Sequence, residues 1–170
     1  MCERALSDLA AGNAELEFWR CFALAKCGEN AGAIAGLDAL LAREDGAELG
    51  LPCVALLLST HSAVPAKSRD KRAMLELKSK LKVVSKSSGE SSLLLAGRYF
   101  LVTSKIPKAR QCIEKLISKN KKDVTLLALF GWIYLLSGEA KYEEKSMQVF
   151  KKAAKLSLPN FDIAVRTQSE

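Results

Sequence analysis

The sequence predicts an all-α protein, an α-solenoid of about eight to nine helices stacked as antiparallel pairs. Composition is the first indication, because apolar residues make up 49% of the chain, Ala and Leu are frequent, and Gly and Pro are sparse. The second indication is an internal repeat, and the third is a set of helix start and stop signals that fit it. We place the solenoid over residues 1–158 and a polar tail over residues 159–170.

The internal repeat is clearest in the second half of the chain. Leu93–Phe100, which contains Gly97, lies 34 residues before Leu127–Tyr134, which contains Gly131. The tetratricopeptide repeat has this period, with the pattern W-x-x-L-G-x-x-Y followed by A-x-x-x-F. Gly costs about 1 kcal/mol of helix propensity relative to Ala, so its recurrence suggests that two helices must approach closely there. We therefore interpret both glycines as packing positions of helix pairs.

The second helix of each pair and an earlier, weaker copy extend the pattern. Ala109 and Ile113 follow Gly97, and the same positions after Gly131 fall on Ser146 and Phe150 if the turn near 140–143 holds three extra residues. The predicted packing residues are Trp19, Phe22, Ala23, Gly97, Phe100, Ala109, Gly131, Tyr134, Phe150 and Ala153. Ala23 precedes Gly97 by 74 residues, or two periods plus six. This spacing predicts a middle repeat with an insertion in the polar stretch 61–70.

Boundary signals place each helix in order. The expected helices are 3–11, 14–27, 31–43, 49–61, 70–84, 90–104, 107–119, 124–137 and 142–158. Gly28 and Gly138 follow apolar helices, as residues just past a helix end commonly do. Asn30 and Asp123 are expected N-caps, and Ser87–Glu90 has the spacing of a capping box. Pro107 suits the first turn of a helix.

The residues that carry chemistry are few. The chain has one histidine, His61, and its five cysteines form no C-x-x-C pair, so we expect no metal site. No glycine-rich phosphate loop is present, and no nucleophile, base and orienting group form a recognisable set. We predict a protein that is not an enzyme, with no catalytic residues, cofactor or small-molecule substrate. The apolar stretch Val54–Leu58 is too short to span a membrane, which favours a cytoplasmic protein.

The charge is unevenly distributed along the chain. Residues 1–64 hold four basic and nine acidic side chains, whereas residues 65–170 hold 22 basic and 10 acidic ones. The predicted partner-binding basic surface comprises Lys67, Arg69, Lys71, Arg72, Lys78, Lys80, Lys82, Lys86 and Arg98. Met74, Leu75, Leu77, Leu81 and Val84 form an apolar stripe between these charges.

Several interpretations of this basic segment stay open. It is either a solvated face of the solenoid, a contact for an acidic protein, or a weak contact for anionic lipid. Nucleic acid is disfavoured, because aromatic side chains do not interleave with the charges.

In the order of its features the chain resembles the N-terminal region of the tetratricopeptide repeat protein 21 family, the repeat subunit of intraflagellar transport complex A. The resemblance covers about Met1 to Lys155. The stretches that carry it are Phe18–Glu29 with Ala33, Leu51–Leu58, Asp70–Leu77, Ala96-Gly97, Lys108–Arg110 and Lys151–Ala153. It implies a protein–protein scaffold in retrograde ciliary transport and cargo sorting, with other complex subunits as partners and a location in the cytoplasm, the cilium and its base. It implies no catalytic residue.

A generic repeat adaptor or co-chaperone that binds a peptide of another protein is the alternative. Such adaptors place basic side chains on the first helices of the repeats to hold a peptide carboxylate. Among the comparable positions of the two clear repeats, Arg98 alone suits a carboxylate, whereas Thr125, Ala128, Leu129 and Trp132 do not.

Overall fold

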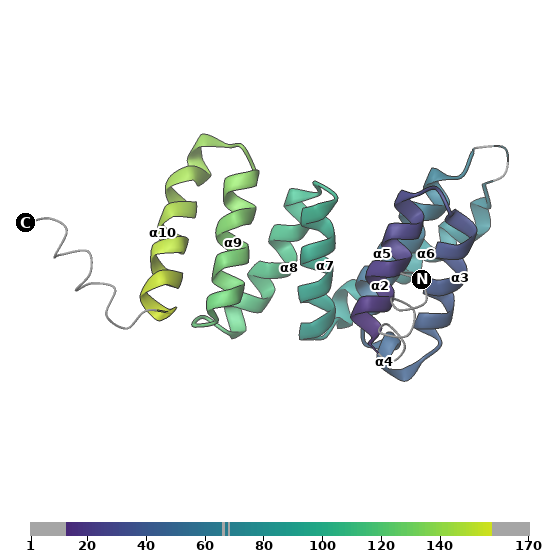
Figure 1. The fold of residues 1–170 in the computed structure, drawn as a ribbon, viewed down its shortest axis with the longest axis horizontal. Helices are drawn as coiled ribbons and strands as arrows, with labels where there is room; N and C mark the ends of the chain where they lie inside the picture. The colour runs from purple at the N-terminus through teal and green to yellow at the C-terminus, as the bar shows by residue number, and fades with distance from the viewer. Residues whose placement is uncertain (1–12, 66, 68, 158–170) are drawn as a thin grey trace, which may run out of the picture. The chain divides into compact units, whose positions relative to one another are not determined.

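The computed structural model describes residues 13–65, 67 and 69–157, and every regular element in this part of the chain is a helix, which confirms the predicted fold class (Figure 1). The helices are α2 (Ala14–Lys26), α3 (Asn30–Leu41), α4 (Glu44–Ala47), α5 (Gly50–Ala63), α6 (Lys71–Ser87), α7 (Glu90–Val102), α8 (Ile106–Lys119), α9 (Val124–Leu136) and α10 (Ala140–Ser157). The predicted helix 3–11 and the tail 159–170 lie outside the described residues.

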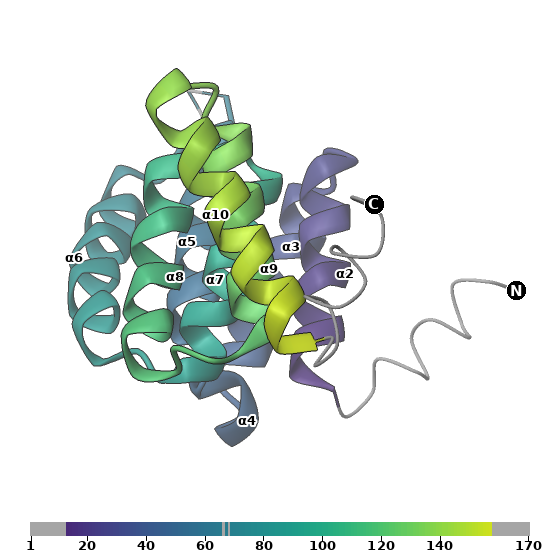
Figure 2. The same ribbon diagram turned by 90° about the vertical axis from the view of Figure 1, so that its left-hand side faces the viewer.

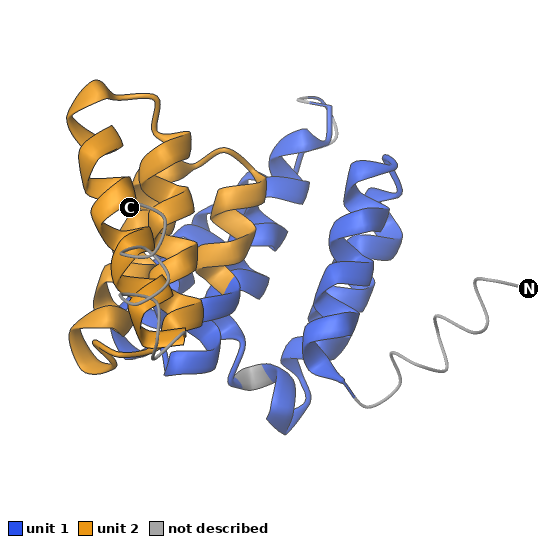
Figure 3. Cartoon of the chain, turned by 60° about the vertical axis from the view of Figure 1, so that its left-hand side comes forward, with its two compact units in different colours: residues 1–95 blue, residues 96–170 orange. Residues whose placement is uncertain are grey.

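The chain divides into two compact units, Met1–Leu95 and Ala96–Glu170, with the boundary inside α7 (Figure 3). Each unit has its own set of packed helices. A single continuous array over residues 1–158 stays a prediction.

Helix α5 is the centre of the first unit. It packs against α3 on one side and α6 on the other, and α2 packs against α3 (Figure 2). Nine of its 14 residues are buried, which fits its sequence because apolar residues occur on all sides of this helix. The rest of the core comes mainly from α2 and α3, through Phe18, Cys21, Leu37 and Leu40.

The second unit shows the repeat directly. Helices α7 and α9 begin 34 residues apart, and so do α8 and α10. Helix α9 packs against both α8 and α10. The Ser146 hydroxyl donates a hydrogen bond of 3.0 Å to the carbonyl of Gly131, which joins α9 to α10 in a buried position.

Most helix ends lie where the sequence signals place them. Gly28 and Gly138 have φ of +86° and +68°, the left-handed conformation that glycine adopts at little cost. The Asp123 carboxylate accepts a hydrogen bond of 3.0 Å from the amide of Leu126 and so caps α9. Pro107 lies in the first turn of α8. The long link between Ala63 and Lys71 confirms an insertion between α5 and α6.

Three predicted details were wrong. Asn30 is the first residue of α3, and Glu29 occupies the N-cap without a side-chain cap bond. Ser87 ends α6, and its hydroxyl donates back to the Val83 carbonyl, so it does not form a capping box. The turn before α10 holds no extra residues, because both hairpin links are three residues long, and α10 instead has 18 residues against 14 in α8.

Candidate functional site

The predicted basic surface lies mainly on α6. Asp70 caps this helix by accepting hydrogen bonds from the amides of Arg72 and Ala73, at 2.9 and 3.0 Å. The apolar residues Met74, Leu77, Leu81 and Val84 are half-buried, and no residue of α6 is fully buried. Helix α6 therefore covers α5 with one side and leaves the other side open to solvent.

The open side of α6 is basic with an apolar centre. Lys71, Leu75, Lys78, Lys82 and Lys86 follow one another at intervals of three or four residues, so they share one side of the helix, and all are exposed. Leu75 is 67% exposed and its neighbour Val83 is 66% exposed. The apolar stripe predicted from the sequence included Leu75, and for this residue the prediction was wrong. Leu75 lies about 100° around the helix from Met74, away from the side that packs on α5. We call these five residues together with Val83 the α6 outer face.

The other predicted basic residues are placed differently. Arg69 is half-buried, and its guanidinium donates to the carbonyls of Ser62 at 2.6 Å and Val64 at 2.9 Å, so it closes the end of α5. Arg72 pairs with Glu76 one helical turn later. Lys67 and Lys80 are exposed, and Arg98 is a half-buried residue of α7 that belongs to the second unit. The structure thus separates a row of exposed lysines from arginines that have structural partners.

The predicted packing residues of the second unit lie between its helices. A side chain at Gly97 would place its Cβ 2.6 Å from Cδ1 of Ile113, and one at Gly131 would place its Cβ 2.8 Å from the ring of Phe150. Only glycine therefore fits these backbones as they stand. Phe100, Ala109 and Ala153 are buried, and Tyr134 and Phe150 are half-buried.

The predicted packing residues of the first repeat lie elsewhere. Ala23 is exposed, and Trp19 and Phe22 are half-buried, whereas Phe18 and Cys21 are fully buried. Gly36 of α3 lies against α2, since an added Cβ there would lie 2.7 Å from the Cys21 sulfur. In this pair the packing glycine is Gly36, on the second helix. Gly36 is therefore the sequence signal that could have shown how α2 and α3 align.

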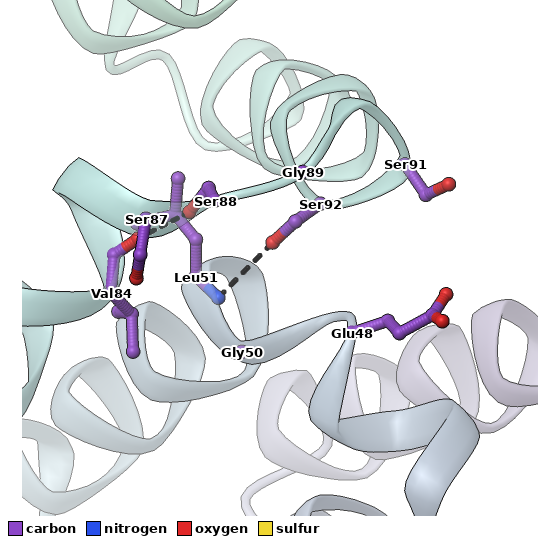
Figure 4. A pocket seen from close by; sticks show the side chains of 9 residues that line it. All are labelled: Glu48, Gly50, Leu51, Val84, Ser87, Ser88, Gly89, Ser91 and Ser92. Carbon is purple, nitrogen blue, oxygen red and sulfur yellow. Dashed lines mark hydrogen bonds between the residues drawn. The ribbon is translucent and has the colours of Figure 1, made fainter.

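A cavity of about 440 Å³ in the first unit lies where α5, α6 and the start of α7 meet (Figure 4). Four serines and Glu48 supply most of its polar wall. In this wall the buried Ser92 hydroxyl accepts a hydrogen bond of 3.2 Å from the amide of Leu51. Because α5 has no side-chain cap of its own, Ser92 satisfies one of its first-turn donors. We interpret this cavity as a joint between helices.

The cysteines of the described residues are free thiols. Burial raises the pKa of Cys53 to about 12, and it also raises the pKa of Cys21 and of Cys112. Within the described part of the chain, no group of three or more His, Cys, Asp or Glu side chains is arranged to hold a metal ion. A search of the same residues finds no helix long and apolar enough to cross a membrane.

Comparisons with known proteins identify the family of the chain. Residues 1–165 match the family model described as the tetratricopeptide repeat protein 21 N-terminal ARM repeat. Tetratricopeptide repeat protein 21B from Xenopus laevis is 30% identical over 101 residues, which cover 57% of this chain and 8% of that relative. Among solved structures, the crystal structure of MamA protein matches with 17% identity and a TM-score of 0.42, covering 90% of this chain and 79% of that one. The family match extends over nearly the whole chain, and the chain therefore belongs to the tetratricopeptide repeat protein 21 family, in its N-terminal repeat region.

Proposed function

We propose that this chain is a protein-binding scaffold of the retrograde ciliary transport machinery, and that the α6 outer face contacts an acidic surface of another subunit of intraflagellar transport complex A. Family membership and the helical-repeat fold support a protein-interaction role. The chain spans only 8% of the length of its Xenopus relative, so the ciliary role, the complex and a location in the cytoplasm and at the cilium are part of the proposal.

The α6 outer face is the observation that carries the choice of surface. It presents four exposed lysines around Leu75 and Val83. The one acidic side chain of α6, Glu76, is already paired with Arg72. A helix with this arrangement offers apolar contact area surrounded by uncompensated positive charge. An acidic partner with an apolar centre is complementary in both respects, and association with it weakens as salt rises.

A pull-down of the full chain from a lysate of ciliated cells tests this proposal. We expect recovery of other complex A subunits, and loss of most of that recovery in the triple variant Lys78→Glu, Lys82→Glu and Lys86→Glu. The control variant, Lys121→Glu, Lys122→Glu and Lys151→Glu, makes the same charge change at exposed sites outside α6 and should retain the partners. Recovery of no complex A subunit would overturn the assignment to the complex. Equal loss in both variants would overturn the choice of α6, and binding to anionic vesicles without any protein partner would favour a lipid contact.

Helix α9 supports the second candidate function, a peptide-binding adaptor. This helix is apolar on all sides, and Trp132 is 52% exposed. The Trp132 ring contacts that of Phe150 edge-on, with centroids 5.7 Å apart, while Leu136 one turn later is 55% exposed. An apolar peptide helix fits such a surface. Recovery of chaperone tails in place of complex A subunits in the pull-down would favour this candidate.

A further inference from the structure

A cavity of about 290 Å³ opens in the second unit, between the first turn of α8 and the link from α9 to α10. Ile106, Pro107 and the fully buried Ile133 give it an apolar wall. Its polar wall comprises Arg110, Tyr134, Ser137, Glu139, Lys141 and Tyr142. The volume suits a side chain better than a large ligand, because drug-sized ligands occupy pockets of roughly 300–1,000 Å³.

Arg110 in this wall has hydrogen-bonding capacity to spare. Its Nη1 donates to the Tyr142 hydroxyl at 2.6 Å, which joins α8 to α10. Its Nε lies 3.6 Å from a carboxylate oxygen of Glu114. This distance allows charge attraction but is too long for a hydrogen bond, and Nε is buried without a hydrogen-bond partner. A planar acceptor in the cavity would meet a guanidinium that is already held in place on one side.

Beside this cavity, the Tyr142 ring gathers more cations than the carboxylates paired with them, because Lys145, which does not line the cavity, also lies over it. The Tyr142 ring stacks on Tyr134, with centroids 5.1 Å apart and the planes inclined by 19°. Three cations lie over the Tyr142 ring, namely Arg110, Lys141 and Lys145, at 5.4, 4.8 and 5.5 Å from its centroid. Two carboxylates pair with members of this group, Glu139 with Lys141 and Glu114 with Arg110. One positive charge in this group therefore has no carboxylate paired with it.

We propose that this cavity binds the carboxylate side chain of an Asp or Glu residue on a partner protein, with the carboxylate at Arg110 and the methylene groups against Ile106 and Pro107. Guanidinium and carboxylate are both planar and match in a two-point contact. One excess charge suits a monoanion, whereas a phosphate dianion would leave a negative charge uncompensated beside Glu114 and Glu139. The inference rests on the proposed function, since it assigns a recognition element to a protein-binding scaffold.

Methyl NMR of the full chain tests the inference with short peptides. We expect acetyl-Gly-Glu-Gly-amide to shift the Ile106 and Ile133 methyl signals saturably, with a Kd of order millimolar, as one side chain contributes only a few kcal/mol. The matched peptide with Gln in place of Glu should produce no saturable shift. Arg110→Gln should weaken binding tenfold or more, and Arg110→Lys should weaken it less because one charge remains. Arg20→Gln, in the other unit, is the control and should bind as the unmodified chain does.

Equal shifts with the Glu and Gln peptides would overturn the proposal, and so would shifts with inorganic phosphate alone. If Arg110→Gln loses its native spectrum, the comparison of the two peptides on the unmodified chain still decides the question. Because the titration needs no cellular partner, its result is independent of the pull-down. If the chain recovers complex A subunits but does not bind the Glu peptide, the proposed carboxylate site is wrong and the proposed function still stands.

Discussion

Helices α6 and α8 have the same kind of sequence but are buried to different depths. Each is the second helix of its hairpin, each is rich in lysine, and each carries an apolar stripe at helical spacing. Helix α8 buries Ala109, Cys112, Ile113 and Leu116, whereas none of the 17 residues of α6 is buried. An amphipathic pattern thus predicts that a helix has a packing side, but it does not predict how deeply that side is covered.

Close approach at a glycine explains part of this difference. A Cβ added at Gly97 would lie 2.6 Å from Ile113 of α8, closer than real contacts allow, so this pair depends on the missing side chain. A Cβ added at Gly50 would lie 3.6 Å from Val84 of α6, an ordinary contact distance. Both hairpins have a glycine opposite a branched side chain, but of the two only Gly97 lies so close that an added Cβ would force that side chain to move. Val84 of α6 leaves room for a Cβ at Gly50, in keeping with the shallower burial of α6.

The largest expected effect comes from truncating the packing side of each helix. Ile113→Ala removes a side chain with no exposed surface and should lower the free energy of unfolding by about 3 kcal/mol. Leu81→Ala removes a half-buried side chain of α6 and should cost about 1 kcal/mol. Urea unfolding followed by circular dichroism measures both values. Equal losses would mean that the packing side of α6 is covered as deeply as that of α8, and the contrast between the two helices would not hold.

The fold was largely predictable from the sequence, because the evidence for it is local. Gly97 and Gly131 recur at the repeat period, Gly28 and Gly138 end helices through their backbone conformation, and Asp123 caps through its own side chain. The register of the first pair was not predictable in this way. Its close approach uses Gly36 on the second helix, so the motif based on the first helix pointed to Ala23, which is exposed.

The candidate site was predictable only in part. Charge and spacing placed lysines on the outside of α6, but they could not show that the Arg69 guanidinium bonds to carbonyls at the end of α5. They also gave no sign of the Arg110 cavity, which depends on a contact with Tyr142, 32 residues away. Nonlocal hydrogen bonds of this kind depend on the packing of helices, and a repeat motif does not encode them.

A smaller effect concerns the α5 side of the α5–α6 hairpin, and it depends on pH. Burial raises the folded-state pKa of Cys53 to about 12, above the ordinary thiol value of 9.0. The stabilisation from keeping this thiol neutral is complete below pH 9 and is lost as pH rises toward 12. At pH 10 the loss should be about 1.4 kcal/mol.

Cys53→Ala tests this linkage, because the lysines that also titrate in this range are common to both proteins. The stability difference between the variant and the parent should change in favour of the variant between pH 8 and pH 10. Cys27→Ala changes an exposed thiol and should show no such pH dependence. A constant difference for Cys53→Ala would indicate that water reaches the thiol through the α5–α6 pair, and that this pair is looser than its buried residues suggest.

The smallest expected effect is a gain of stability at the turn that enters α8. Ser104 has φ of 56°, the left-handed conformation that costs a residue with a Cβ roughly 1 kcal/mol. The hydrogen bonds around it are those of a glycine-type helix end, since the Lys105 amide donates to the Phe100 carbonyl at 2.8 Å and the Ser104 amide to Leu101 at 3.0 Å. Ser104→Gly should therefore raise the free energy of unfolding by about 0.5–1 kcal/mol.

Ser137→Gly, in the link before α10, is the control and should lower the free energy of unfolding. Ser137 has φ of −68°, and its hydroxyl donates a hydrogen bond to the Tyr134 carbonyl. If both variants lost stability, the left-handed conformation of Ser104 would cost less than the backbone entropy that glycine loses on folding.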